Sequence, residues 1–139
     1  MSSKLLSYTF CIALSGVVPP SLALSEAENA AQATSVEQHV SDRALERWNL
    51  MIEGRFESAY AYLTPGYRAT HTIAAYNRTI RGGIWKKADV QSVSCEGQRC
   101  EVKVMLDILL DAKKPVPVWV DETWIQTEQE GEWWYIPPL

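Results

Sequence analysis

Apolar residues recur with a helical spacing after residue 34. The residues that repeat every four positions are Val36, Val40, Ala44, Trp48 and Ile52. This spacing is typical of one face of an α-helix. Residues 34–37 (TSVE) match a capping box at its start, and Gly54 suits a left-handed cap at its end. We therefore expect a helix from about residue 34 to residue 52.

Two shorter helices are expected after Gly54. Residues 56–63 carry an apolar face, and the pair Pro65 and Gly66 should end that segment. Residues 72–81 have a partly apolar face and are followed by two glycines, which should stop the third helix. Three helices are thus predicted before the first strand.

The pattern changes from helical to alternating after Trp85. The apolar positions of the clearest strand are Cys100, Val102, Val104, Leu106, Ile108 and Leu110. Charged residues such as Glu101 and Lys103 lie between them, as in a half-buried antiparallel strand. Residues 89–95 are its expected hairpin partner.

Two further strands are predicted near the C-terminus, over residues 116–126 and 132–136. The alternation changes phase near Asp121 and Glu122, which predicts a β-bulge in the third strand. Glu130 and Gly131 predict the turn before the fourth strand.

The first 23 residues have the pattern of a secretory signal peptide. Lys4 supplies the positive charge, an apolar run covers residues 5–18, and residues 21–23 (SLA) offer a cleavage site. The run of about 14 residues is shorter than the roughly 20 that cross a bilayer. We therefore expect cleavage after Ala23, export to a bacterial periplasm or the extracellular medium, and no membrane span afterwards.

Residues 24–33 show no buried face and are expected to form a flexible tail, which leaves one folded domain over residues 34–139. The 47% hydrophobic content and six tryptophans favour a folded chain over a disordered one. The 13 lysines and arginines are scattered and the net charge is −4, so a nucleic-acid partner is not expected.

Cys95 and Cys100 are the two cysteines that would remain after cleavage. They flank four residues at the tip of the predicted hairpin, where opposed positions can meet disulfide geometry in an oxidising compartment. A redox pair or a metal site is the alternative, but the spacing is not C-x-x-C and only His39 and His71 could add imidazole ligands. We expect a structural disulfide and no metal or cofactor.

The candidate site residues are one carboxylate and a set of aromatic side chains. Asp107 lies in mid-strand, and a pocket around it would raise its pKa and suit it to proton transfer; the alternative is a solvent-facing position. The aromatic residues either line a ligand cavity or fill the core. The pocket candidates are Tyr60, Tyr76, Trp119 and Trp124.

Residues 53–65 (EGRFESAYAYLTP), followed by a strand that ends near Trp124 and by residues 131–134 (GEWW), resemble the nuclear transport factor two-like superfamily, which includes ketosteroid isomerase-like and SnoaL-like proteins. The resemblance runs from about Ser35 to the C-terminus. It implies helices packed in a curved antiparallel sheet that forms a cone, and dimerisation through the sheet in many members. In the isomerase-like members an acidic base works with tyrosine donors, roles in which Asp107 would be combined with Tyr60 or Tyr76.

The sequence therefore predicts an α+β fold with N-terminal helices packed on a curved, cone-like antiparallel sheet of four strands. The leading hypothesis is an exported, non-enzymatic domain that binds a small apolar ligand or a partner protein. One alternative is an isomerase, dehydratase or hydrolase of the same fold that uses Asp107. The other is a structural subunit of an envelope assembly, and a homodimer through the sheet is left open.

Overall fold

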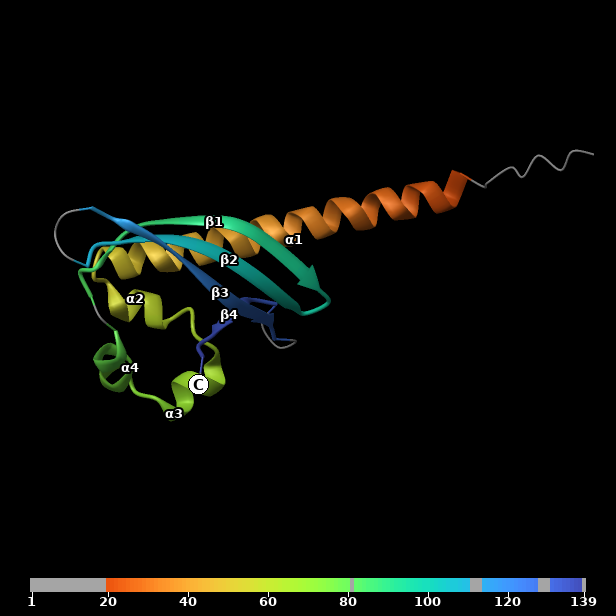
Figure 1. Cartoon of the computed structure of the whole chain (residues 1–139). Coiled ribbons are helices and arrows are strands. Elements are labelled where there is room, and N and C mark those ends of the chain that lie inside the picture. Colours follow the sequence, from red (N-terminus) through yellow and green to blue (C-terminus); the bar gives the residue numbers. More distant parts are fainter. Residues whose placement is uncertain (1–19, 81, 111–113, 128–130, 139) are drawn as a thin grey trace, which may run out of the picture.

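The described residues form four helices and one antiparallel sheet (Figure 1). The computed structural model describes residues 20–80, 82–110, 114–127 and 131–138. The helices are α1 (Pro20–Ile52), α2 (Phe56–Tyr60), α3 (Pro65–Thr70) and α4 (Ile73–Thr79). The strands are β1 (Trp85–Glu96), β2 (Arg99–Ile108), β3 (Val116–Gln126) and β4 (Trp133–Ile136).

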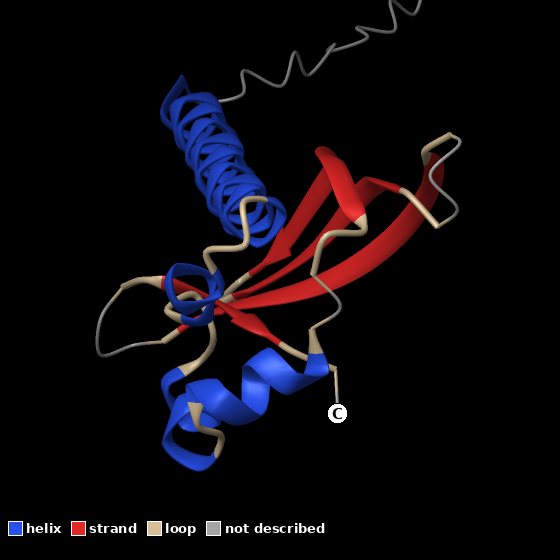
Figure 2. Cartoon of the chain, turned by 90° about the vertical axis from the view of Figure 1, so that its left-hand side faces the viewer, coloured by secondary structure: helices blue, strands red, loops and turns tan. Residues whose placement is uncertain are grey.

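The strands follow one another as a meander in the order β1-β2-β3-β4, and each neighbouring pair is antiparallel. Figure 2 shows that the strands are bent rather than flat. The predicted α+β class, with N-terminal helices packed on a four-stranded antiparallel sheet, is confirmed. None of the helices in the described ranges is both long and apolar enough to cross a membrane.

Helix α1 starts much earlier than the sequence pattern predicted. It begins at Pro20, so residues 24–33 are helical and the predicted start at residue 34 is wrong. The Thr34 hydroxyl donates a hydrogen bond to the Ala30 carbonyl oxygen (3.0 Å), which places it within a running helix rather than at a cap. The first part of α1 extends beyond the sheet (Figure 1) and therefore needs no apolar face. Most of the predicted signal peptide lies outside the described residues and stays a prediction.

Helix α1 ends with a left-handed cap at Gly54, as the sequence predicted. Gly54 has a φ of 76°, its N–H donates to the Met51 carbonyl, and the Arg55 N–H donates to the Leu50 carbonyl. These two bonds form a Schellman cap, in which glycine takes the left-handed position at the least steric cost.

The residues after Gly54 form three short helices instead of two. Helix α2 ends at Tyr60, and Pro65 begins α3 instead of breaking a helix, because the Thr64 side chain caps the new helix at the Tyr67 N–H (3.3 Å). Proline is favoured at a first helical position, where its missing N–H has no partner to lose. Helix α4 confirms the third predicted helix with narrower bounds.

The strand predictions hold with three changes. Strand β3 has the predicted bounds, but no bulge lies at Asp121 and Glu122, since the β2–β3 register is continuous. The register breaks instead lie in β1, which also begins earlier, at Trp85. Leu110 lies outside β2 and is 66% exposed, so its predicted place on the buried face is wrong. The turn residue Glu130 lies outside the described residues.

The disulfide between Cys95 and Cys100 is confirmed. The two residues are register partners at the tip of the β1–β2 hairpin, with their Cα atoms 4.0 Å apart. Cys100 is buried, so the bond joins the hairpin tip to the core.

The core lies between α1 and one face of the sheet, which we call the inner face. Its strand residues include Ala88, Cys100, Val102, Val104, Leu106, Trp124 and Tyr135. From α1 the contributors include Val40, Ala44, Trp48 and Met51. The β-strand alternation leaves the other positions on the outer face.

Candidate functional site

A cavity of about 400 Å³ opens where α1, α3 and α4 meet the inner face of the sheet. Its walls are mainly aromatic and aliphatic. The residues that define it include Met51, Tyr67, Tyr76, Ile80, Trp85 and Tyr135. Arg47 is the one charged residue among the described residues that line this cavity.

Strand β4 is held at this cavity by the loop after α2. Leu63 forms an isolated bridge with Tyr135; the Tyr135 N–H donates to the Tyr62 carbonyl (2.9 Å) and the Thr64 N–H donates to the Tyr135 carbonyl (3.2 Å). Tyr135 is also the register partner of Trp124, so both side chains lie on the inner face. The position of the Tyr135 ring is therefore fixed from both sides of β4.

A buried ion pair lies beside the cavity. Arg47 is 4% exposed and Glu122 is 1% exposed, and Arg47 Nη1 lies 2.9 Å from Glu122 Oε1. Two indole groups also donate to this carboxylate: Trp48 Nε1 to Oε1 (2.8 Å) and Trp124 Nε1 to Oε2 (2.9 Å). Three donors thus compensate the buried charge of Glu122, as burial of a carboxylate requires.

The Arg47 guanidinium is less fully bonded than its partner. Its Cζ lies 3.9 Å from the centre of the Tyr135 ring, and Nη2 makes a long 3.4 Å hydrogen bond to the Tyr76 hydroxyl. Its Nε is buried and has no hydrogen-bond partner within the described ranges. Burial, the largest single influence, would lower the pKa of Arg47, but Glu122, Tyr76 and Tyr135 together outweigh it, so the pKa is raised and Arg47 stays charged.

Burial raises the pKa of Tyr135 from 10.0 to about 12. Between these two values the unfolded chain has lost the phenolic proton while the folded chain keeps it, so stability must fall as the pH rises through this window. We expect Tyr135→Phe to remove about 3 kcal/mol of this alkaline loss. Chemical unfolding at a series of pH values measures the change.

The control for this prediction is Tyr62→Phe. Burial also raises the pKa of Tyr62 to about 12, but its side chain is only partly buried and the solvent should screen much of its effect. Equal alkaline losses in the wild-type and Tyr135→Phe proteins would contradict the burial of the Tyr135 hydroxyl.

Of the four predicted pocket residues, Tyr76 alone is among the described residues that line the cavity. The Tyr60 hydroxyl donates to the His71 carbonyl (2.6 Å), and its ring lies beside the Tyr76 ring with the centroids 5.5 Å apart. Trp124 is fully buried against Glu122. Trp119 is 56% exposed and pairs in register with Met105 on the outer face.

Asp107 also lies on the outer face. Its register partners are Lys87 and Pro117, and its neighbour Leu106 is the residue that points into the core. The structure therefore brings Asp107 together with neither Tyr60 nor Tyr76.

Sequence reasoning missed Arg47 and Glu122, the two charged residues of the site. A signal for both was present. Arg47 falls between Ala44 and Met51 on the apolar face of α1, and Glu122 falls between Val120 and Trp124 in an unbroken alternation. Each charge therefore lies on an apolar face, but the spacing does not show that these two faces meet.

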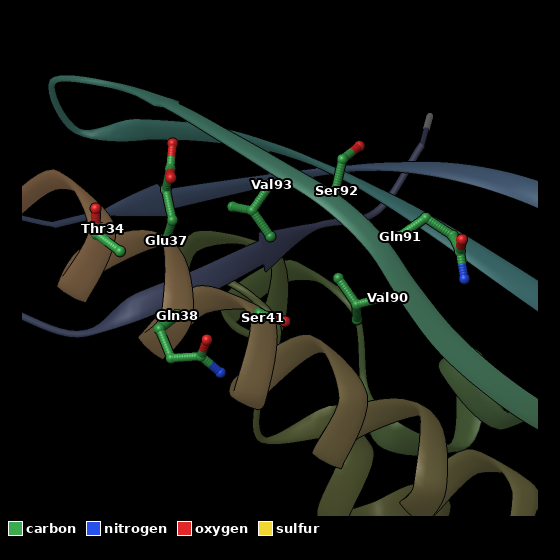
Figure 3. A pocket seen from close by; sticks show the side chains of 8 residues that line it. All are labelled: Thr34, Glu37, Gln38, Ser41, Val90, Gln91, Ser92 and Val93. Carbon is green, nitrogen blue, oxygen red and sulfur yellow. The ribbon is translucent and has the colours of Figure 1, made fainter.

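A second hollow, of about 240 Å³, lies between α1 and β1 (Figure 3). Val90 and Val93 point towards the helix there, and Ser92 points away. The helix side presents Thr34, Glu37, Gln38 and Ser41, with only one charge among them. This groove offers neither an enclosed apolar wall nor a converging set of polar groups.

Within the described residues no group of three or more histidine, cysteine or acidic side chains could hold a metal ion. No protein-family model matches the chain, and no curated protein matches its sequence.

Proposed function

We propose that this chain is an exported domain of the nuclear transport factor two-like superfamily that binds a small, largely apolar ligand in the cavity beside Arg47. The order of helices followed by an antiparallel meander agrees with what the sequence resemblance implies. The disulfide between Cys95 and Cys100 supports export, because such bonds persist in oxidising compartments.

The cavity is the observation that carries the binding proposal. Its volume of about 400 Å³ falls in the range of small-molecule sites, and its wall combines apolar surface with a few polar groups. The aromatic residues Tyr76, Trp85 and Tyr135 supply much of that wall. A ligand with an apolar body would replace water against these rings, which is favourable.

The chemistry of the wall favours binding over acid–base catalysis. The described residues that line the cavity include no carboxylate and no histidine. Glu122 lies behind Arg47 and already accepts hydrogen bonds from three donors. The raised pKa of Tyr135 makes its phenol a poor acid near neutral pH.

The test is the mass of the protein after export. The precursor is expressed with export intact, and the mature protein is purified without reductant and weighed under native and denaturing conditions. We expect the native mass to exceed the polypeptide mass by the mass of a bound small molecule, which denaturation releases. Thr79→Trp should reduce it, because Thr79 lines the cavity and a larger side chain there would narrow it.

Arg78→Trp is the matched control, since Arg78 is exposed on the same helix and does not line the cavity. It should retain the ligand. Polypeptide mass alone in all three proteins, together with failure to bind added apolar compounds, would count against the proposal.

The exposed indole of Trp119 favours a second candidate function, a protein interface on the outer face of the sheet. Trp119 is 56% exposed, and tryptophan is enriched at protein interfaces. This candidate includes the homodimer and the envelope subunit, and sedimentation equilibrium of the wild-type and Trp119→Ser proteins tests it.

A further inference from the structure

Two donors of Arg47 are poorly satisfied among the described residues: Nε has no acceptor, and Nη2 makes one long hydrogen bond. Glu122 accepts from Arg47 through a single contact, at Nη1, and not through a paired fork. Nη2 makes only the 3.4 Å bond to Tyr76, and Nε makes none within the described part of the chain. The edge formed by Nε and Nη2 is therefore the unsatisfied edge of a guanidinium that is more than nine-tenths buried.

This edge has the geometry of a carboxylate receptor. The Nε–H and one Nη2–H are parallel donors, and two such donors match the two oxygens of a planar carboxylate. A buried donor without an acceptor costs free energy, so a ligand that supplies one gains affinity.

The pairing of Glu122 leaves Arg47 available to a second anion. Trp48 and Trp124 donate to both oxygens of Glu122, so its negative charge does not depend on Arg47 alone. The Tyr135 ring lies against the guanidinium at 3.9 Å and holds its plane in place. An ordered guanidinium loses little freedom when a ligand binds it.

We propose that the cavity binds an amphipathic monocarboxylate, whose carboxylate pairs with Nε and Nη2 of Arg47 and whose apolar body lies along Met51, Ile80 and Trp85. This inference rests on the proposed binding function and names the chemical class of its ligand. The walls favour an aliphatic or aromatic body, and the single charged group lining the cavity favours one acidic head.

The test compares decanoate with decanol, which share an apolar chain and differ in the head group. Titration calorimetry near neutral pH on the mature, delipidated protein gives both affinities. Decanol is the more hydrophobic probe, so an apolar cavity alone would prefer it. We expect decanoate to bind at least about tenfold more tightly, as a charge-assisted pair provides.

The variant is Arg47→Met combined with Glu122→Gln. It removes both charges of the pair, keeps similar volumes, and leaves an amide oxygen that can accept from an indole. Its fold is checked by circular dichroism and unfolding before the titrations. The preference for decanoate should disappear, so that the ratio of the two affinities reflects only the hydrophobicity of the probes.

Three results separate the inference from the proposed function. Tighter decanoate binding that the double variant abolishes supports both. Decanol binding as tight as decanoate binding, or a decanoate preference that persists in the double variant, overturns the carboxylate assignment and leaves the binding function standing. Binding of neither probe to the wild-type protein overturns the assignment and also counts against the proposed function.

Discussion

Glu122→Ala should lower the free energy of unfolding by about 3–5 kcal/mol. The substitution leaves the Arg47 guanidinium, which is 4% exposed, as a buried charge without its counter-ion. It also removes the acceptor of the Trp48 and Trp124 indoles. Unfolding in guanidinium chloride, followed by circular dichroism, measures the change. The denaturant concentration at the midpoint should fall, while the dependence of the unfolding free energy on denaturant should stay the same.

The matched control is the double variant Arg47→Met with Glu122→Gln. Replacing both members of a buried pair with uncharged groups of similar volume is often neutral or stabilising, whereas removing one member is costly. We therefore expect the double variant to recover most of the loss. If Glu122→Ala were within about 0.5 kcal/mol of the wild-type protein, as for an ordinary surface change, the pair would not be buried in solution.

Burying the Arg47–Glu122 pair costs desolvation free energy, so a reason for keeping the pair is needed. The Arg47–Glu122 bond joins α1 to β3 across 75 residues of sequence. A well-packed apolar pair could supply similar stability. It could not supply the free guanidinium edge, which is the chemical feature that the ligand proposal requires.

The spacing of apolar residues within single elements correctly predicted the buried faces of α1 and β2. The apolar stripe of Val40, Ala44 and Trp48 on α1 is buried, and the alternation of Val102, Val104 and Leu106 gives the inner face of β2. The disulfide was predicted from hairpin geometry and from the expectation of export. Each of these features depends on residues that are close in sequence.

The early start of α1 could not be found by a search for a buried face. Residues 24–33 are rich in alanine, glutamate and glutamine, which favour helix without needing a packing partner. The prediction at Pro65 was also wrong. A proline that breaks one helix and a proline that begins the next look alike unless the capping role of Thr64 is considered.

The site was missed because no role was assigned to Arg47 and Glu122 was explained by a bulge. A carboxylate at an inward position looks like a change of phase, although the β2–β3 register is continuous. Val118, Val120 and Trp124 in fact continue one alternation through it. The inference that Glu122 points inwards needs a cation on the facing element, and that pairing is set by tertiary structure and not by spacing.

Trp124→Ala should cost about 3–5 kcal/mol of stability, while Trp119→Ala should cost less than about 0.5 kcal/mol. The two tryptophans lie on the same strand five residues apart, and both were predicted pocket residues. Trp124 is fully buried and its indole donates to Glu122 Oε2 (2.9 Å), so its removal leaves a cavity and takes one donor from a buried carboxylate. Trp119 is 56% exposed on the outer face.

Unfolding followed by far-ultraviolet circular dichroism compares the two variants without relying on the fluorescence of the residues that are changed. A large loss for Trp124→Ala alone would support the assignment of even-numbered β3 residues to the inner face, because the register of β3 on β2 is continuous. Equal losses for the two variants would mean that a second surface covers Trp119. The protein-interface candidate would then gain weight, since burial of that indole requires a partner on the outer face.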